Sequence, residues 1–170
     1  LHLLKATSIE LKSYSEWLFG KKLLEKAVTD PDSMKSKRVD RVVLFMDIRG
    51  FTKWSECHTP EEVVEMLNKY FSISEKILYE HDSIKVMYTG DEVFAVFAES
   101  DLALHAALIL RHAINELLSP FEIGAGIGIN KGSVMEGVFG GDNIRYYGVI
   151  GDTVNTGKRI EGNASSNEIL

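Results

Sequence analysis

The chain has 170 residues and a mass of 19.0 kDa, the size of one domain with a single hydrophobic core. Its hydrophobic fraction of 45% and charged fraction of 26% exclude a disordered or fibrous chain. With 19 basic and 25 acidic residues the net charge is −6, so we expect no nucleic-acid-binding surface and no polybasic membrane patch, both of which need clustered positive charge.

The N-terminal segment is predicted to be helical. Apolar side chains recur at helical spacing over residues 9–28, with an interruption at Gly20. Such a stripe either packs on the rest of the domain or pairs with a partner chain. We place a helical segment and linker at residues 1–38 and the main domain at 39–170. Residues 1–10 lack the features of a signal peptide.

No apolar run approaches the roughly 20 residues that a membrane-spanning helix needs. The one cysteine, Cys57, excludes an intrachain disulfide and a multi-cysteine zinc site. We therefore expect a cytoplasmic chain without a membrane segment.

A strand and a capped helix open the main domain. Residues 42–46 are continuously apolar, which is typical of a strand buried on both faces. Thr59-Pro60-Glu61-Glu62 places threonine at the N-cap, proline at the first helical position and glutamate three residues after the cap. This capping box predicts a helix whose apolar stripe covers residues 63–78.

Two hairpins and two further helices are predicted after it. The runs that we assign to strands are residues 84–88, 92–97, 121–130 and 133–139. The first two flank Gly90 and the last two flank Gly132, so each pair is predicted to form a β-hairpin. We expect a second amphipathic helix from Ser100 and a last helix from Asp152. Residues 168–170 resemble the beginning of a strand.

This order of elements predicts an α+β fold with a ferredoxin-like βαββαβ core, an added hairpin and helix, and an N-terminal helical extension. In that topology the first two strands run parallel, and the third lies between them and antiparallel to both. Asp47 ends the first strand, and Asp91 lies in the turn before the third. The two carboxylates should therefore meet at one edge of the sheet.

This meeting of carboxylates predicts a metal site. Facing carboxylates raise each other's pKa unless a cation neutralises them, and such oxygen ligands suit Mg²⁺ or Mn²⁺. The turn and short helix after Asp47 present successive backbone N–H groups, which favour an anion. The predicted phosphate-binding residues are Ile48, Arg49, Gly50, Phe51 and Thr52. Metal carboxylates beside a phosphate site indicate chemistry on a nucleoside triphosphate, without specifying the reaction.

Four blocks of sequence, in order, resemble the class III nucleotidyl cyclase domain. They are Val43–Thr52, Thr89–Val93, Gly126–Gly132 and Val149–Arg159. Agreement of four blocks at fitting spacings is far more specific than a single motif. The resemblance implies a lyase that cyclises a nucleoside triphosphate to a 3′,5′-cyclic nucleotide and pyrophosphate, in the synthesis of a second messenger.

The resemblance also implies roles for individual residues. Two Mg²⁺ or Mn²⁺ ions would be bound by Asp47 and Asp91, with the backbone carbonyl of Ile48 added. Asn155 and Arg159 match the residues that orient the ribose and stabilise the transition state at the α-phosphorus. In this family the metal pair comes from one protomer and the asparagine–arginine pair from the other. A homodimer with two sites at its interface is therefore implied.

Both base-reading positions depart from the family's pattern. Met87 stands where adenylyl cyclases have lysine and guanylyl cyclases have glutamate, and Gly148 stands where aspartate or threonine is usual. With Phe45 these residues form the predicted base pocket. Because hydrogen-bonded sites discriminate strongly and apolar ones weakly, three interpretations stay open: a relaxed purine cyclase, a pyrimidine cyclase, and an inactive nucleotide-binding signalling module.

We favour a uridylate cyclase that makes cyclic UMP, or cyclic CMP, in anti-phage defence, because the compact chain is similar to short bacterial members with altered base positions. An adenylate cyclase that makes cyclic AMP is the alternative. The intact metal and transition-state residues argue against an inactive module. The family's triphosphate-binding lysine or arginine normally lies beyond Leu170, so either the native chain continues or Arg145 or Lys158 takes this role.

Overall fold

The computed structural model describes the backbone of residues 2–170 and the side chains of residues 7–16 and 19–170. The α-helices are α1 (His2–Phe19), α2 (Lys21–Thr29), α3 (Phe51–Ser55), α4 (Pro60–Glu80), α5 (Ser100–Leu118) and α6 (Asp152–Asn163). The strands are β1 (Lys37–Arg49), β2 (Lys85–Thr89), β3 (Glu92–Phe97), β4 (Gly124–Gly140) and β5 (Arg145–Ile150). Short 3₁₀ turns occupy Pro31–Met34 and Ser119–Phe121. Among the described residues, no helix combines the length and hydropathy needed to cross a bilayer.

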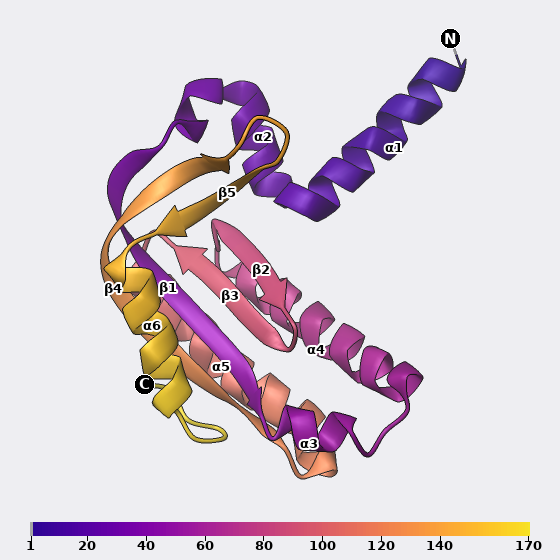
Figure 1. The fold of residues 1–170 in the computed structure, drawn as a ribbon, viewed down its shortest axis with the longest axis vertical. Coiled ribbons are helices and arrows are strands. Elements are labelled where there is room, and N and C mark those ends of the chain that lie inside the picture. The colour runs from indigo at the N-terminus through magenta and orange to yellow at the C-terminus, as the bar shows by residue number, and fades with distance from the viewer. Residues whose placement is uncertain (1) are drawn as a thin grey trace.

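The five strands form a sheet in the order β2-β3-β1-β4-β5 with antiparallel neighbours. Helices α4 and α5 cover one face and α6 lies on the other (Figure 1). The alternation of side chains along β1 explains this arrangement. Leu44 and Met46 belong to the core with α4 and α5, whereas Val43 and Phe45 lie against Gly157 of α6. The predicted α+β fold with its βαββαβ core is confirmed.

Several local predictions are also confirmed. Strand β3 lies between β1 and β2, and the end of β1 meets the start of β3 where Met46 pairs with Val93. The β2–β3 hairpin turns at Gly90, whose φ of 62° is left-handed. Both hydrogen bonds of the Thr59 capping box are present at the start of α4. Residues 168–170 pair in parallel with β4 through Ile127.

The predicted hairpin at Gly132 is wrong, because β4 is one continuous strand of 17 residues. Gly132 pairs with Arg41 of β1, and a side chain there would place its Cβ 2.6 Å from Thr153 Oγ1 at the start of α6. The glycine is thus needed for close packing and not for a turn. Strand β1 begins at Lys37, before the apolar run that predicted it, and gives β4 a partner along most of its length. The actual turn lies at residues 141–144, before β5.

The N-terminal helices differ in how they contact the domain. Gly20, with φ of 80°, separates α1 from α2 as predicted. In α2, Leu23 is buried, and the Lys22 Nζ atom lies 2.6 Å from Asp82 Oδ1. Helix α1 projects from the body of the domain (Figure 1) and exposes apolar side chains such as Ile9. The predicted stripe also includes Trp17, whose side chain, like that of residue 18, lies outside the described residues.

A strip of glycines on β4 brings α6 and its connection directly against the sheet. A Cβ atom at Gly126 would lie 2.7 Å from Arg49 Nη2, and one at Gly128 would lie 2.3 Å from the backbone nitrogen of Glu161. The missing side chains therefore make room for the Arg49 guanidinium and for the last turn of α6. This packing holds Glu161 beside the end of β1.

We predict that Gly128→Ala lowers the free energy of unfolding by about 2–3 kcal/mol, because the nearest atoms to the new methyl group are backbone atoms that have no room to move. Gly162→Ala is the matched control. It lies in α6, the helix that packs on Gly128, with no atom within 4 Å of the added Cβ, so we expect it to stabilise the fold by about 0.5 kcal/mol. Equilibrium urea unfolding followed by circular dichroism measures both. A Gly128→Ala protein as stable as the parent would contradict this account of α6 packing.

Candidate active site

The two predicted metal ligands lie together at the end of β1. The Ile48 N–H donates a hydrogen bond to Asp47 Oδ1 at 3.0 Å and to Asp91 Oδ2 at 3.2 Å. The antiparallel pairing of β1 and β3 produces this meeting, because it places the β2–β3 turn beside the last residues of β1.

The proximity of the two carboxylates contributes to a raised pKa of Asp91. Burial, followed by the neighbouring Asp47 carboxylate, raises the pKa of Asp91 to about 7. Without a cation, Asp91 therefore takes up a proton as the pH falls through about 7. A divalent cation between them would remove the repulsion that raises this pKa.

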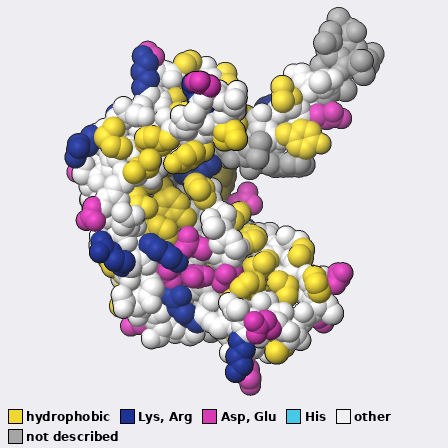
Figure 2. Space-filling view, in the orientation of Figure 1, with side chains coloured by type: hydrophobic (Ala, Val, Ile, Leu, Met, Phe, Trp, Pro, Cys, Tyr) yellow, Lys and Arg dark blue, Asp and Glu magenta, His cyan; other side chains and the backbone are white. Residues whose placement is uncertain are grey.

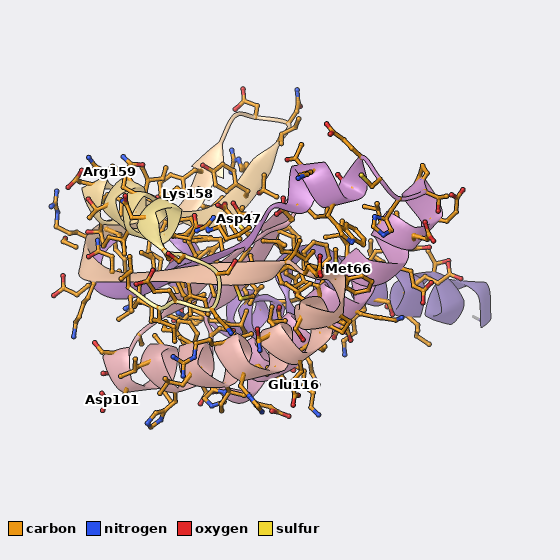
Figure 3. All side chains as sticks on the ribbon, turned by 90° about the horizontal axis from the view of Figure 1, so that it is seen from below. Asp47, Met66, Asp101, Glu116, Lys158 and Arg159 are labelled. Atoms are coloured by element: carbon orange, nitrogen blue, oxygen red, sulfur yellow. The ribbon has the colours of Figure 1, made fainter. Side chains whose placement is uncertain are left out.

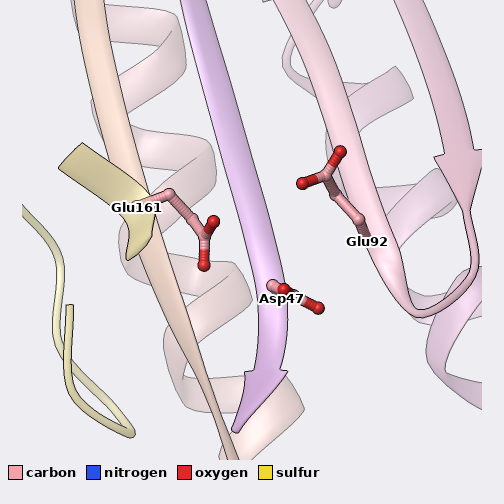
Figure 4. Close-up of side chains that lie close together, drawn as sticks. All are labelled: Asp47, Glu92 and Glu161. Carbon is pink, nitrogen blue, oxygen red and sulfur yellow. The ribbon is translucent and has the colours of Figure 1, made fainter. Parts of the chain in front are cut away.

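Two further acids, Glu92 and Glu161, join Asp47. One carboxylate oxygen from each lies within 4.8 Å of the others, although the three residues come from β3, α6 and β1 (Figure 4). Glu161 is fully buried. Neither glutamate was predicted as part of the site. The signal for Glu161 in the sequence is its spacing of three residues from Lys158 on one helix, and Glu92 directly follows a predicted metal ligand.

Two cations compensate these acids in part. Lys158 Nζ lies 2.7 Å from Glu161 Oε2 and 3.6 Å from Asp47 Oδ2, and it also contacts the Glu92 carboxylate. Burial alone would lower the pKa of Lys158, but the hydrogen bonds to the two glutamates raise it well above the ordinary value. Arg49 contacts the Glu161 side chain and donates from Nε to the backbone oxygen of Ala164 at 2.8 Å.

The donor set fits Mg²⁺ or Mn²⁺. It consists of carboxylate oxygens, which hard divalent cations prefer. The four acids and two bases leave a formal deficit of positive charge when all are ionised.

Beneath the site, the buried Tyr70 hydroxyl has no hydrogen-bond partner among the described residues. Burial, and then the charges of Asp47 and Asp91, raise the pKa of this phenol.

The predicted phosphate-binding segment is only partly free to bind an anion. The Ile48 N–H is already donated to the two aspartates, which leaves its carbonyl as the group it can offer. The Arg49 side chain is held by Glu161 and by the backbone that follows α6. Gly50, in a left-handed conformation with φ of 82°, precedes α3, which begins at Phe51 and Thr52. The first N–H groups of a helix lack partners within it, so these three residues stay the predicted phosphate contacts.

Asn155 and Arg159 share a face of α6 that differs from the face near the acids. The Arg159 side chain is 70% exposed and lies 3.4 Å from Asp152 and 3.0 Å from the Thr156 hydroxyl. Figure 3 shows Lys158 between Arg159 and Asp47. The described chain therefore does not bring Arg159 to its own Asp47.

The predicted base-pocket residues are divided over the sheet. Phe45 and Met87 lie on the same face, on either side of Phe94, and the Phe45 and Phe94 ring centroids are 4.6 Å apart. Met87 is 37% exposed. Figure 2 shows hydrophobic side chains beside acidic ones in a hollow on this face. Gly148 lies in β5 and pairs with Gly137, at the opposite edge in strand order.

Comparison with known proteins identifies related sequences and folds. Residues 34–170 match the family described as the adenylate and guanylate cyclase catalytic domain. The adenylate cyclase of Anabaena cylindrica is 36% identical over 132 residues, covering 71% of this chain and 26% of that protein. The solved guanylyl cyclase Cya2 is 31% identical with a TM-score of 0.73, covering 80% of this chain and 76% of that one. A solved guanylyl cyclase domain of the fungus Blastocladiella emersonii, described as a non-canonical dimer, is 27% identical with a TM-score of 0.71, covering 80% of this chain and 81% of that one.

The chain thus spans about a quarter of the length of the curated relative from Anabaena cylindrica.

We predict that Asp91→Asn stabilises the metal-free protein most at alkaline pH. The pKa of Asp91 is about 7 in the folded state and about 3.9 in the unfolded chain. Its contribution to stability is therefore full below the unfolded pKa and is lost as the pH rises through about 7. Asparagine does not ionise, so the melting temperature of the variant should exceed that of the parent at pH 8, with a smaller difference at pH 5.

Thermal unfolding in the presence of a chelator measures this effect, and Asp142→Asn in the exposed β4–β5 loop is the control. Mn²⁺ should raise the melting temperature of the parent protein and have much less effect on Asp91→Asn. A difference between variant and parent that does not change with pH would contradict the prediction.

Proposed function

We propose that this chain, which belongs to the adenylate and guanylate cyclase catalytic domain family, converts a nucleoside triphosphate into a 3′,5′-cyclic nucleotide and pyrophosphate. The observation that carries the proposal is the meeting of Asp47 and Asp91 around the Ile48 amide. Apolar residues would pack better in this position than two carboxylates do. The raised pKa of Asp91 supports the proposal that the pair lacks a compensating cation.

Asp47 and Asp91 would hold the metal ions, with the Ile48 carbonyl beside them. When bound, such ions lower the pKa of the ribose 3′-hydroxyl and neutralise the phosphates. Arg159 would stabilise the charge that develops at the α-phosphoryl group, since a guanidinium stays charged and donates several hydrogen bonds. Asn155, one helical turn earlier, would orient the ribose.

The position of Arg159 supports the proposal of a homodimer. The Arg159 side chain is 70% exposed and contacts Asp152 and Thr156, but none of the four acids of the site in its own chain, so it is available to a second copy. We propose that each active site combines Asp47 and Asp91 of one chain with Asn155 and Arg159 of another. Under this arrangement one copy alone is inactive.

The similar proteins favour a purine nucleotide as the substrate. The relatives described above are adenylate and guanylyl cyclases, so the similarity gives no support to the predicted uridylate cyclase or to its role in anti-phage defence. We favour ATP, and hence cyclic AMP, as the substrate and product. The exposed, apolar Met87 beside Phe94 favours weak discrimination between bases, because it offers no hydrogen bond to a base edge.

Mixing two inactive variants tests the proposed reaction and the dimer together. Asp47→Ala and Arg159→Ala should each lower the rate of pyrophosphate and cyclic nucleotide formation by at least about 100-fold. An equimolar mixture that exchanges subunits should recover about a quarter of the parent activity, because half of the dimers then hold one intact site of two. No recovery, with exchange demonstrated, would contradict the composite site. A parent protein that binds triphosphates without releasing pyrophosphate would contradict the cyclase.

Base selection is tested with ATP, GTP, CTP and UTP at equal concentrations with Mn²⁺. We expect cyclic AMP as the main product, with measurable turnover of the other triphosphates. Met87→Lys, which adds a donor on the same strand face, should raise the preference for ATP over UTP by at least about tenfold. Val64→Lys, which adds the same charge at a position of α4 that is 55% exposed, should leave the preference unchanged. Cyclic UMP as the main product of the parent would overturn the assignment to ATP.

A further inference from the structure

The Lys158 ammonium lies beside a triangle of carboxylates formed by Asp47, Glu92 and Glu161. It contacts all three carboxylates, at 3.6 Å from Asp47 and 2.7 Å from Glu161, and in direct contact with Glu92. The three oxygens lie within 4.8 Å of one another, which is the arrangement that a cation would require. The Lys158 ammonium therefore neutralises part of the negative charge of the three carboxylates.

Lys158 lies next to Arg159 in the sequence but has different surroundings. The Arg159 side chain is 70% exposed and the Lys158 side chain 46%. Glu161, the partner of Lys158 one turn later, is fully buried. A buried carboxylate needs a counter-ion, because leaving it unpaired is strongly destabilising. Arg49 also contacts Glu161, so this carboxylate keeps one cation when Lys158 moves.

Asp47 belongs both to this triangle and to the pair that it forms with Asp91. A divalent ion on that pair would therefore share a carboxylate with the Lys158 ammonium. Two cations near one carboxylate repel each other, and the repulsion is strong where solvent is partly excluded. The Lys158 side chain is long and half-exposed, so it is the cation that is free to move away.

We propose that Lys158 is a tethered cation that competes with the divalent metal ion for Asp47. In the metal-free protein it holds Asp47, Glu92 and Glu161 together, and it leaves Asp47 when the metal ion binds. Lys158 is thus a positioning residue that sets how tightly the site takes up metal. The proposal rests on the proposed role of Asp47 and Asp91 as metal ligands, but not on the nature of the nucleotide or on catalysis.

The test measures Mn²⁺ binding by calorimetry, in the full chain and without nucleotide. Lys158→Met should bind Mn²⁺ about tenfold more tightly than the parent, because a unit charge next to the ion is removed from a partly solvated site. The same variant should unfold at a lower temperature without metal. Lys158→Arg keeps the charge and should bind Mn²⁺ as the parent does. Lys69→Met removes a helical lysine that pairs with Glu65 at 2.7 Å on the surface, and it should change neither property.

The outcomes separate competition from a structural role. Unchanged or weaker Mn²⁺ binding by Lys158→Met, with lowered stability, would overturn the proposal. A second measurement needs no variant: acetylation of Lys158 in the parent protein, quantified by mass spectrometry against Lys69. Mg²⁺ at saturation should speed the modification of Lys158 several-fold, and an unchanged or slower rate would also overturn the proposal. Cyclic nucleotide formation by the parent is a separate result, so failure of this proposal and failure of the proposed function are distinguishable.

Discussion

The arrangement of charge at the end of β1 is the constraint on which the rest of the site depends. Four carboxylates from β1, the β2–β3 turn, β3 and α6 meet there, and only Arg49 and Lys158 compensate them within the described contacts. Removing one partner of a buried ion pair lowers the stability of the fold far more than replacing both partners by apolar residues does. The position of α6 on the sheet is therefore fixed by electrostatics as well as by packing. The remaining deficit of positive charge is the reason for proposing that the site binds a divalent ion.

The glycines of β4 make this arrangement possible. Without side chains at Gly126 and Gly128, the Arg49 guanidinium and the backbone of α6 lie directly on the strand. The Arg49 side chain then reaches both Glu161 and the carbonyl that follows the helix. These two glycines have no chemical function of their own, but they determine where the acids and bases of the site lie. The close packing of α6 on β4 also explains why a glycine occurs at position 132 inside a continuous strand.

The sequence predicted the part of the site that depends on strand order and missed the part that depends on helix packing. The meeting of Asp47 and Asp91 follows from an inserted antiparallel strand, which the order of elements already implies. Glu161 and Lys158 reach the site only because α6 packs at a particular position along β4. No local periodicity in the sequence encodes that position. The wrong hairpin has a related cause. A glycine in a turn and a glycine under a helix look alike in sequence, and only the contact with Thr153 distinguishes them.

Helix α6 connects the two halves of the proposed mechanism. One of its faces carries Lys158 and Glu161 toward the acids of its own chain, and another carries Asn155 and Arg159 outward. The helix is a rigid element of 12 residues, so its side chains keep fixed directions relative to one another. Lys158 therefore contacts the Asp47 of its own chain, whereas Arg159 contacts Asp152 and Thr156 instead. This division of α6 into two faces is the structural reason for proposing that a second copy completes the site.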